Sequence, residues 1–316
     1  MSALLAPSAC KPNRFFRLRK SHCLQPNVKI YTKQALIEKL KAIAKLGWIP
    51  NARHGNVGGI GNTLEDLLEI KENNLPIPNA AEWELKTQRS NTTSLTTLFH
   101  SEPSPRAIRF VPQILLPKYG WLHQEAGKRY GAVEMSFRQT IHGAAPSDRG
   151  FMVKIDRPER KVLVSFNAAK VAQKHAAWLQ EVKERVGLGE LKPQPYWGFD
   201  DLAHKAGTKL LNCFYVQADV RKDGEREFYN YKKVMMLQRF SFEGFLQAIE
   251  KTTILIDFDA RTGHNHGTKF RLRQTFLPTL YEKQTVNYNP RSPRLTFSLD
   301  AAFSQFCDFH ILPLTY

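Results

Sequence analysis

Cysteine is scarce in this chain of 316 residues, and long apolar runs are missing. The four cysteines form no CxxC pair and no Cys/His cluster with zinc-finger spacing, which excludes the common zinc modules and a disulfide scaffold. Scattered cysteines in a chain of this length indicate a reducing cytoplasm. No apolar stretch approaches the ~20 residues that cross a bilayer, and the first twenty residues have the reverse order of a secretory signal. We therefore expect a soluble, cytoplasmic protein without a membrane partner.

Acidic residues are also few relative to basic ones. Lysine and arginine number 46 against 29 acids, which gives a formal net charge of +17. Such a surplus attracts polyanions, because basic side chains neutralise phosphates and release counterions. Ribosomal, membrane-surface and DNA-binding proteins share this property, so charge favours a nucleic acid without selecting a type. The chain lacks an aromatic motif of the RNP kind, which weighs against an RNA-binding protein.

The order of elements indicates an α+β fold, and 42% hydrophobic residues suffice for a large core. Helical spacing of apolar residues predicts helices over 32–46, 63–72, 167–186, 199–207 and 242–251. We expect Asn62 or Thr63 to cap the second of these and Asn167 to cap the third. Alternating or continuous apolar runs predict strands over 82–89, 132–141, 151–155, 161–166, 212–220, 228–238 and 252–260. Much of the pairing should be antiparallel, because the strands follow one another through short turns.

The candidate chemistry begins in the strand predicted over 82–89. Glu84 and Lys86 stand two residues apart, so both side chains point to one side. A hard divalent cation prefers carboxylate oxygens, and it lowers the pKa of bound water. A lysine beside it can orient the nucleophile or neutralise the transition state. Alone, this pair is a weak signal, because an exposed strand face gives the same pattern. A proline-rich extended segment before it, and a helix with Glu65 upstream, strengthen it.

The segment GWIPNARHGNVGGIGNTLEDLLEIKENNLPIPNAAEWELKTQRS resembles the catalytic core of the MvaI/BcnI restriction endonucleases, relatives of the MutH mismatch-repair nickase. The shared features are G-x-G-N-T-L-E-x-L-L, E-N-N-x-P and E-x-K-x-Q-R. The resemblance returns at ARTGHNHGTKFRLR and so spans roughly 35–290. It implies a PD-(D/E)xK core, in which helices flank a mixed sheet, together with a second DNA-recognition lobe. The implied activity is Mg²⁺-dependent hydrolysis of phosphodiester bonds.

By position, the resemblance makes Glu84 a metal ligand, Lys86 the catalytic lysine and Glu65 a supporting acid. The family pattern expects aspartate five residues before Glu84, and this chain has Asn79. Asparagine offers a neutral oxygen, so metal affinity and water activation should both decrease. Three explanations stay open: an introduced Asp→Asn change that traps uncut DNA, a natural variant of reduced activity, and an error of register in placing the motif.

Basic and polar residues crowd the segment 260–273. They are Arg261, His264, Asn265, His266, Lys269, Arg271 and Arg273. Arginine pairs with guanine, asparagine with adenine, and histidine with either. Composition alone fits a base-reading loop and a solvated basic hairpin equally well, and the resemblance favours base reading. His100 is a second candidate for base contact, while Arg53 and His54 could contact phosphate or the minor groove. Asp257 and Asp259 could form a second metal site, but support of the arginines is favoured.

The resemblance also implies an organisation. We expect a basic N-terminal extension (1–30), the first part of a catalytic lobe (31–125), the rest of the core with the DNA-recognition lobe (126–290), and a C-terminal extension (291–316). The implied enzyme is a monomer in the cytoplasm of a bacterium or archaeon. It would clamp double-stranded DNA at a short CCNGG-like site, nick one strand and rebind inverted.

Two rival functions remain. A MutH-like repair nickase would depend on a partner ATPase and on strand methylation. A sequence-specific DNA-binding protein without activity is favoured by Asn79.

Overall fold

The computed structural model describes residues 31–53, 59–70, 83–90, 92–93 and 95–288. The predicted extensions 1–30 and 291–316 lie outside these residues, as do His54 and Asn79. No helix in the described part of the chain is long and apolar enough to cross a membrane.

The strands in the described part of the chain form three sheets, and the first of these has five strands. They are β1 (Ile49–Pro50), β10 (Arg226–Phe240), β9 (Asn212–Asp223) and β2 (Glu84–Arg89) in spatial order, with β14 (Tyr281–Tyr288) also paired to β10. β9 and β10 form a long antiparallel hairpin, whereas β2 joins β9 in parallel. Helices α1 (Lys33–Lys45) and α2 (Gly59–Leu67) bury their apolar residues with those of one face of this sheet. Residues distant in the sequence therefore build this sheet together.

The second sheet has six strands. They are β3 (Leu95–His100), β13 (Lys269–Arg273), β11 (Ile254–Arg261), β5 (Met135–Ile141) and β4 (Trp121–Leu122), with β12 (His264–Asn265) paired to β11. Alternation along these antiparallel strands separates two faces. Phe137, Phe258 and Phe270 are fully buried on the apolar face. Charged residues occupy the other face, which is the polar face of the second sheet.

A third sheet and the remaining helices cover the apolar face of the second. The sheet consists of β6 (Arg149–Asp156), β7 (Lys161–Val171) and β8 (Tyr196–Gly198). The helices are α3 (Leu116–Tyr119), α4 (Ala176–Val186), α5 (Phe199–Leu210) and α6 (Phe242–Glu250), with short helical segments over Arg106–Ile108, Val111–Leu115, Gln173–His175 and Gln274–Leu280. Phe151 and Trp178 contact each other, and Phe151 also contacts Phe137, so α4 lies behind the second sheet, opposite its polar face.

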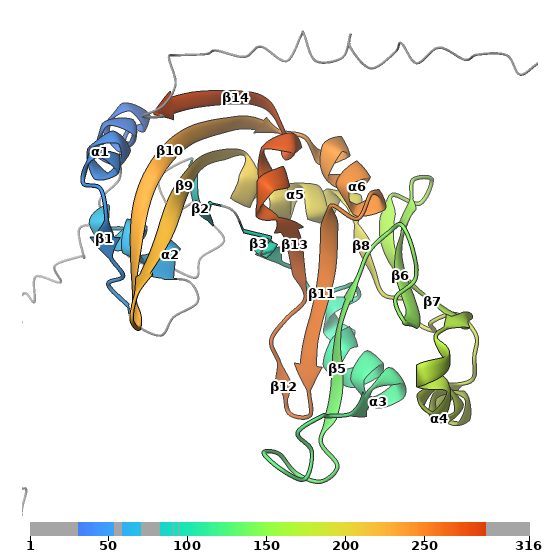
Figure 1. Cartoon of the computed structure of the whole chain (residues 1–316). Helices are drawn as coiled ribbons and strands as arrows, with labels where there is room; N and C mark the ends of the chain where they lie inside the picture. The colour runs from blue at the N-terminus through green and yellow to red at the C-terminus, as the bar shows by residue number, and fades with distance from the viewer. Residues whose placement is uncertain (1–30, 54–58, 71–82, 91, 94, 289–316) are drawn as a thin grey trace, which may run out of the picture.

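The ribbon forms an arch in Figure 1. Helices α1 and α2 lie at one end, the long strands of the first sheet cross the top, and the second sheet descends toward the other end. The β9–β10 hairpin and the β11–β12 hairpin both point toward the open side of this arch. This arrangement places the two segments singled out in the sequence in different arms of one molecule.

Most of the predicted elements are present, with two corrections. The predicted α+β class with mainly antiparallel pairing is confirmed, and Thr32 caps α1 by accepting a hydrogen bond from Ala35 N at 3.2 Å. The expected cap at Asn62 or Thr63 is wrong, because α2 already begins at Gly59. The Thr63 hydroxyl instead accepts a hydrogen bond from Ala52 N at 3.3 Å inside the core.

The helix predicted from Asn167 is also wrong in its first part. Strand β7 continues to Val171, which pairs with Arg149, and the α-helix begins only at Ala176. Gly150 allows this pairing, because a Cβ there would lie 2.4 Å from the Asn167 carbonyl oxygen. Asn167 uses its side-chain oxygen to accept from Ala169 N at 3.0 Å within the strand. Tertiary pairing thus overrides the local helix signal.

Candidate functional site

Glu84 and Lys86 lie on the face of β2 that is turned away from helices α1 and α2. Leu85 packs in the core formed with α1 and α2, and alternation along the strand places its two neighbours on the opposite face. In the parallel pairing with β9, Glu84 is opposite Cys213 and Lys86 opposite Tyr215. The same-side orientation predicted from the sequence agrees with this placement.

The two side chains form a close ion pair in a buried setting. Lys86 Nζ donates to Glu84 Oε1 at 2.7 Å, and the side chains are 18% and 5% exposed. The second carboxylate oxygen, Oε2, is buried and has no hydrogen-bond partner among the residues that the structure describes. A buried anionic oxygen without a partner is costly, because nothing replaces its lost hydration. The site is therefore suited to a further positive group at Oε2.

The surroundings of Glu84 are poor in water. Cys213 is fully buried next to it, and burial raises the pKa of the thiol to about 12. Burial likewise raises the pKa of Tyr281 well above its usual value, with further contributions from Cys213 and Glu84. Electrostatic interactions are stronger in such a medium than in water. A cation bound to the Glu84 carboxylate would therefore interact with it with little screening by solvent.

The remaining polar residues of β2 fix the strand in place. Gln217 Nε2 donates to Gln88 Oε1 at 3.1 Å, one step farther along the Glu84 face. Arg89 makes a two-pronged ion pair with Glu227, at 3.1 and 2.9 Å. This contact raises the pKa of Arg89 and lowers that of Glu227. The E-x-K-x-Q-R motif therefore combines the Glu84–Lys86 pair with two anchors to the neighbouring strands.

Glu65 lies on α2, which packs against β2. A Cβ on Gly61 would lie 3.3 Å from Thr87 Oγ1, and Glu65 follows Gly61 by one helical turn, on the same stripe. Arg53 is bound to the same helix by Asp66, at 2.7 Å. The structure therefore places Glu65 on the side of α2 that faces the strand, and it holds Arg53 at the outer surface.

The described residues do not make up a complete cation site. They contain no group of three or more His, Cys, Asp or Glu side chains that could hold a metal. Asn79, the expected second ligand, lies outside the described residues. Glu84 Oε2, which is buried and without a hydrogen-bond partner in the described part of the chain, fits a hard cation, because such ions prefer carboxylate oxygens.

The second cluster of candidates lies at the β11–β12 hairpin, in the other arm of the arch (Figure 1). His264, Asn265 and His266 are all exposed, and the two imidazole rings lie 6.4 Å apart and nearly parallel. Arg273 is also exposed, at the end of β13. These side chains are accessible to a partner, although the Asn265 oxygen already accepts from Gly267 N at 3.1 Å.

Two other candidates lie on the polar face of the second sheet, each paired with an acid. Lys269 contacts Asp259 at 3.2 Å, and Arg271 contacts Asp257 at 3.1 Å. Asp257 also accepts from the Thr140 hydroxyl at 2.9 Å. These contacts fit the supporting role for the two aspartates, and no described cluster supports a second metal site there.

Arg261 ends β11 next to the turn of the hairpin, where it pairs with His264, and its side chain is largely occupied. Its guanidinium bonds to Glu134 at 2.8 Å and lies over the Tyr130 ring, 4.5 Å from the centroid. The side chain is 24% exposed. The structure therefore places Arg261 between the hairpin and the loop that precedes β5.

Glu102 is a residue that the sequence did not single out. Its carboxylate accepts from Thr268 N at 2.8 Å and from the Thr268 hydroxyl at 3.2 Å, and it reaches the Asn265 amide at 3.5 Å. A Cβ on Gly267 would lie 3.3 Å from the His100 ring and 3.5 Å from Glu102. One carboxylate thus joins the end of β3 to the turn after β12. Partners so far apart in the chain leave no local sequence signal.

His100 lies opposite Lys269 at the end of β3. Burial, the charge of Lys269 and the charge of Lys205 lower its pKa below the usual 6.5, against the opposing effect of Glu102. The neutral imidazole is therefore the main form at neutral pH, with one donor and one acceptor for a base edge.

This shift predicts a titration result. The folded state binds the His100 proton less tightly than the unfolded chain, so stability decreases as the pH falls through 6.5 toward the folded-state pKa. NMR of the His100 ring, assigned with His100→Gln, should give a midpoint below 6.5. Lys269→Ala should raise this midpoint, because it removes a nearby positive charge. A midpoint at or above 6.5, or one unmoved by Lys269→Ala, contradicts the explanation.

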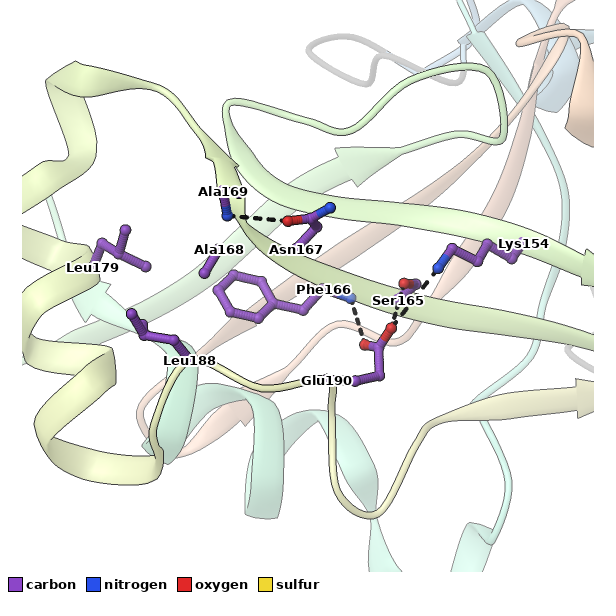
Figure 2. A pocket seen from close by; sticks show the side chains of 9 residues that line it. All are labelled: Lys154, Ser165, Phe166, Asn167, Ala168, Ala169, Leu179, Leu188 and Glu190. Atoms are coloured by element: carbon purple, nitrogen blue, oxygen red, sulfur yellow. Dashed lines mark hydrogen bonds and ion pairs between the residues drawn. The ribbon is translucent and has the colours of Figure 1, made fainter.

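A cavity of about 540 Å³ lies apart from both clusters, between β7 and α4 (Figure 2). Phe166, Leu179 and Leu188 contribute its apolar wall, and Glu190 lies at its edge. Glu190 accepts from Phe166 N at 2.7 Å and from the Ser165 hydroxyl at 2.5 Å. The carboxylate fastens the loop after α4 to the third sheet, and none of the candidate site residues lines this cavity.

Comparison with known proteins decides the family. A model of the MvaI/BcnI restriction endonuclease family matches residues 37–281. The chain belongs to this family. Membership makes it, by family, a site-specific DNA endonuclease, as the resemblance in the sequence implied. A comparison with curated proteins gave no match.

Solved structures of one family member are similar to this chain. The complex of the restriction endonuclease MvaI with cognate DNA matches with a TM-score of 0.64 and 22% identity, over 81% of this chain and 99% of that one. MvaI without DNA matches with a TM-score of 0.48 and 23% identity, over 82% and 99%. The first likeness confirms the predicted restriction-endonuclease fold.

Proposed function

We propose that this chain is a Mg²⁺-dependent type II restriction endonuclease that cuts double-stranded DNA at a short CCNGG-like site. The observation that carries the proposal is the buried Glu84–Lys86 pair, whose second carboxylate oxygen has no partner among the described residues, in a chain of this family. Restriction endonucleases generally use divalent metal ions. Glu84 and Asn79 would hold the cation, which supplies positive charge to the phosphate and acidifies bound water.

The residues of the chain then have distinct tasks. Lys86, fixed by Glu84 at 2.7 Å, would donate a hydrogen bond to the phosphate oxygen on which charge develops. Glu65 would support the site from α2, which packs against the other face of β2, beside Thr87. The buried surroundings of Cys213 keep this contact effective by excluding water. Attack by water in line with the leaving oxygen would complete the hydrolysis.

In this proposal, the DNA sequence is recognised by residues of the second sheet and its β11–β12 hairpin. His264, Asn265, His266 and His100 would meet base edges, with Lys269, Arg271 and Arg273 beside them. Arg53 and His54 would approach the DNA from the catalytic arm, and Arg261 would act beside the turn of the hairpin. A monomer would nick one strand and rebind in the inverted orientation.

The deciding test compares this chain with its Asn79→Asp variant on a mixed plasmid substrate in Mg²⁺. We expect Asn79→Asp to cut into discrete fragments at least tenfold faster, because a second carboxylate strengthens metal binding. Equal cutting by both chains would show that the ligand at 79 is dispensable or wrongly placed. If neither chain cuts any substrate, the nuclease proposal fails for this chain.

Asn79 favours one alternative, a sequence-specific DNA-binding protein without catalytic activity. Such a protein would bind one duplex sequence selectively and gain no cleavage from Asn79→Asp. A MutH-like nickase would instead cut one strand only, and cutting would depend on a partner ATPase. Mapping of nicks and double-strand breaks on both strands separates these outcomes.

A further inference from the structure

The connection between β4 and β5 is a folded loop, residues 123–134. A single carbonyl, that of Glu125, accepts hydrogen bonds from the backbone N–H groups of Lys128, Arg129 and Tyr130, at 3.0 to 3.2 Å. His123 N donates to Glu134 O at 2.7 Å and closes the loop at its base. The loop therefore holds a defined shape that does not require a partner.

This loop is fastened to the β11–β12 hairpin. Met135 N donates to the Thr262 hydroxyl at 2.9 Å, and Thr262 N donates to Met135 O at 3.1 Å. Arg261 adds its ion pair with Glu134 and its stacking on Tyr130. Because these contacts include a backbone pair, a backbone-to-hydroxyl hydrogen bond and a largely buried ion pair, the loop and the hairpin form one unit.

Both elements project from the same end of the second sheet, and the loop extends beyond β12 in Figure 1. Near its tip, the loop exposes two adjacent cations, Lys128 and Arg129. Neither forms an ion pair with a carboxylate among the residues that the structure describes, unlike Lys269 and Arg271 on the sheet. Val133 is 82% exposed on the same loop, an apolar side chain with no packing role of its own.

We infer that the loop 123–134 is a second DNA-contact element, in which Lys128 and Arg129 bind the phosphate backbone beside the groove that the β11–β12 hairpin enters. Arg261 is then a positioning residue: its guanidinium holds the loop 123–134 against the β11–β12 hairpin through Glu134 and Tyr130. Val133 lies where an apolar side chain meets sugar or thymine methyl groups. The inference rests on the proposed function, because it takes duplex DNA as the partner of the hairpin.

Charge and spacing support this assignment. The loop continues the exposed polar end formed by His264, Asn265 and His266, so one duplex can reach both. Lys128 and Arg129 form no ion pair within the described residues, so they can bind phosphate without breaking one, although Arg129 lies over the Tyr130 ring at 5.7 Å. Contacts of this kind fix the register of the protein on the duplex and carry no sequence information.

The test measures DNA affinity of the full chain by fluorescence anisotropy over a range of salt concentrations, in a buffer with Ca²⁺ in place of Mg²⁺. The double variant Lys128→Ala/Arg129→Ala should bind roughly tenfold more weakly at 0.1 M salt. Its slope of log affinity against log salt should be smaller by about 1.8, since about 0.9 counterions are released for each phosphate contact. The ratio of cognate to non-cognate affinity should change less than about twofold.

The matched control is Lys170→Ala/Lys183→Ala, which removes the same charge from β7 and α4, behind the second sheet. The control should retain the salt slope of the parent chain. Equal losses in both double variants would overturn the inference, because net charge alone would explain them. An unchanged slope in the loop variant would overturn it as well.

The outcomes also separate this inference from the proposed function. If the parent chain binds duplex DNA and the loop variant binds equally well, only the inference is wrong. If the parent chain binds no duplex at any salt concentration, the proposed function fails. Arg261→Ala adds an independent readout. This variant should lower the affinity for cognate DNA while leaving the slope of log affinity against log salt nearly unchanged, because it removes a contact between the loop and the hairpin and no phosphate contact.

Discussion

Replacement of Lys86 by methionine should lower the single-turnover rate of DNA cleavage about a thousandfold. Methionine keeps the unbranched stem and removes the ammonium group that lies 2.7 Å from Glu84. Removal of one donor that stabilises transition-state charge costs about 10²–10³ in rate, and the buried setting increases its effect. A thousandfold loss corresponds to about 4 kcal/mol in the barrier. Plasmid cleavage should be measured in whichever parent cuts, this chain or its Asn79→Asp variant.

The matched control for this variant is Lys45→Met, at the exposed C-terminal end of α1, which should cut at the parent rate. Binding of duplex DNA by Lys86→Met should stay within about tenfold of the parent, because most of the phosphate contacts remain. Thermal unfolding shows whether the variant is folded. A folded Lys86→Met protein that cuts within tenfold of the parent would remove the lysine from the chemistry.

Loss of the Glu102 carboxylate should impair the selection of the DNA sequence more than the hydrolysis of the phosphodiester bond. Glu102→Ala leaves the buried Thr268 N–H without an acceptor and frees the turn that follows β12. An unsatisfied buried donor costs roughly 1–3 kcal/mol, which corresponds to about 5- to 150-fold. We expect cleavage at the cognate site to slow by about 100-fold and cut ends to spread over related sequences. Sequencing of the DNA ends, together with rates on the cognate duplex, measures both effects.

Glu102→Gln supplies the control, because its amide oxygen can still accept from Thr268 N. This variant should recover most of the cognate rate, whereas a purely electrostatic role would leave it as impaired as Glu102→Ala. Non-specific affinity should be similar in all three chains, since Glu102 contacts no phosphate. Unchanged selectivity in Glu102→Ala would show that the turn holds its shape without this carboxylate.

The sequence predicted the local features of the fold well. The α1 helix starts and ends close to the expected residues, because its cap and its apolar stripe are encoded within one segment. The β9–β10 hairpin was equally readable, since two β-rich runs flank a short polar turn. The family resemblance, carried by the glycine-rich helix start and the Glu84–Lys86 strand, is confirmed by the family match.

The missed features depend on contacts between distant segments. Asn167 looks like a helix cap in its own neighbourhood, and only pairing of Arg149 with Val171 reveals the strand. Burial of the Glu84–Lys86 pair follows from β9, and the Glu102 anchor crosses 166 positions of the chain. The sequence suggested Arg261 as a DNA-binding residue, but its main contacts in the structure are Glu134 and Tyr130. The roles of the individual site residues stay predictions until the variants are measured.

The parallel pairing of β2 with β9 has a consequence for biosynthesis. Gln88 and Gln217 meet across 129 positions, so the strand with Glu84 and Lys86 leaves the ribosome long before its neighbour exists. Closing so large a loop is slow, and long-range strand pairing delays folding further. A nascent or prematurely terminated chain that ends before β9 carries both residues without a sheet to hold them. The Glu84–Lys86 pair therefore takes its buried position in the sheet only after β9, and with it most of the chain, has been made.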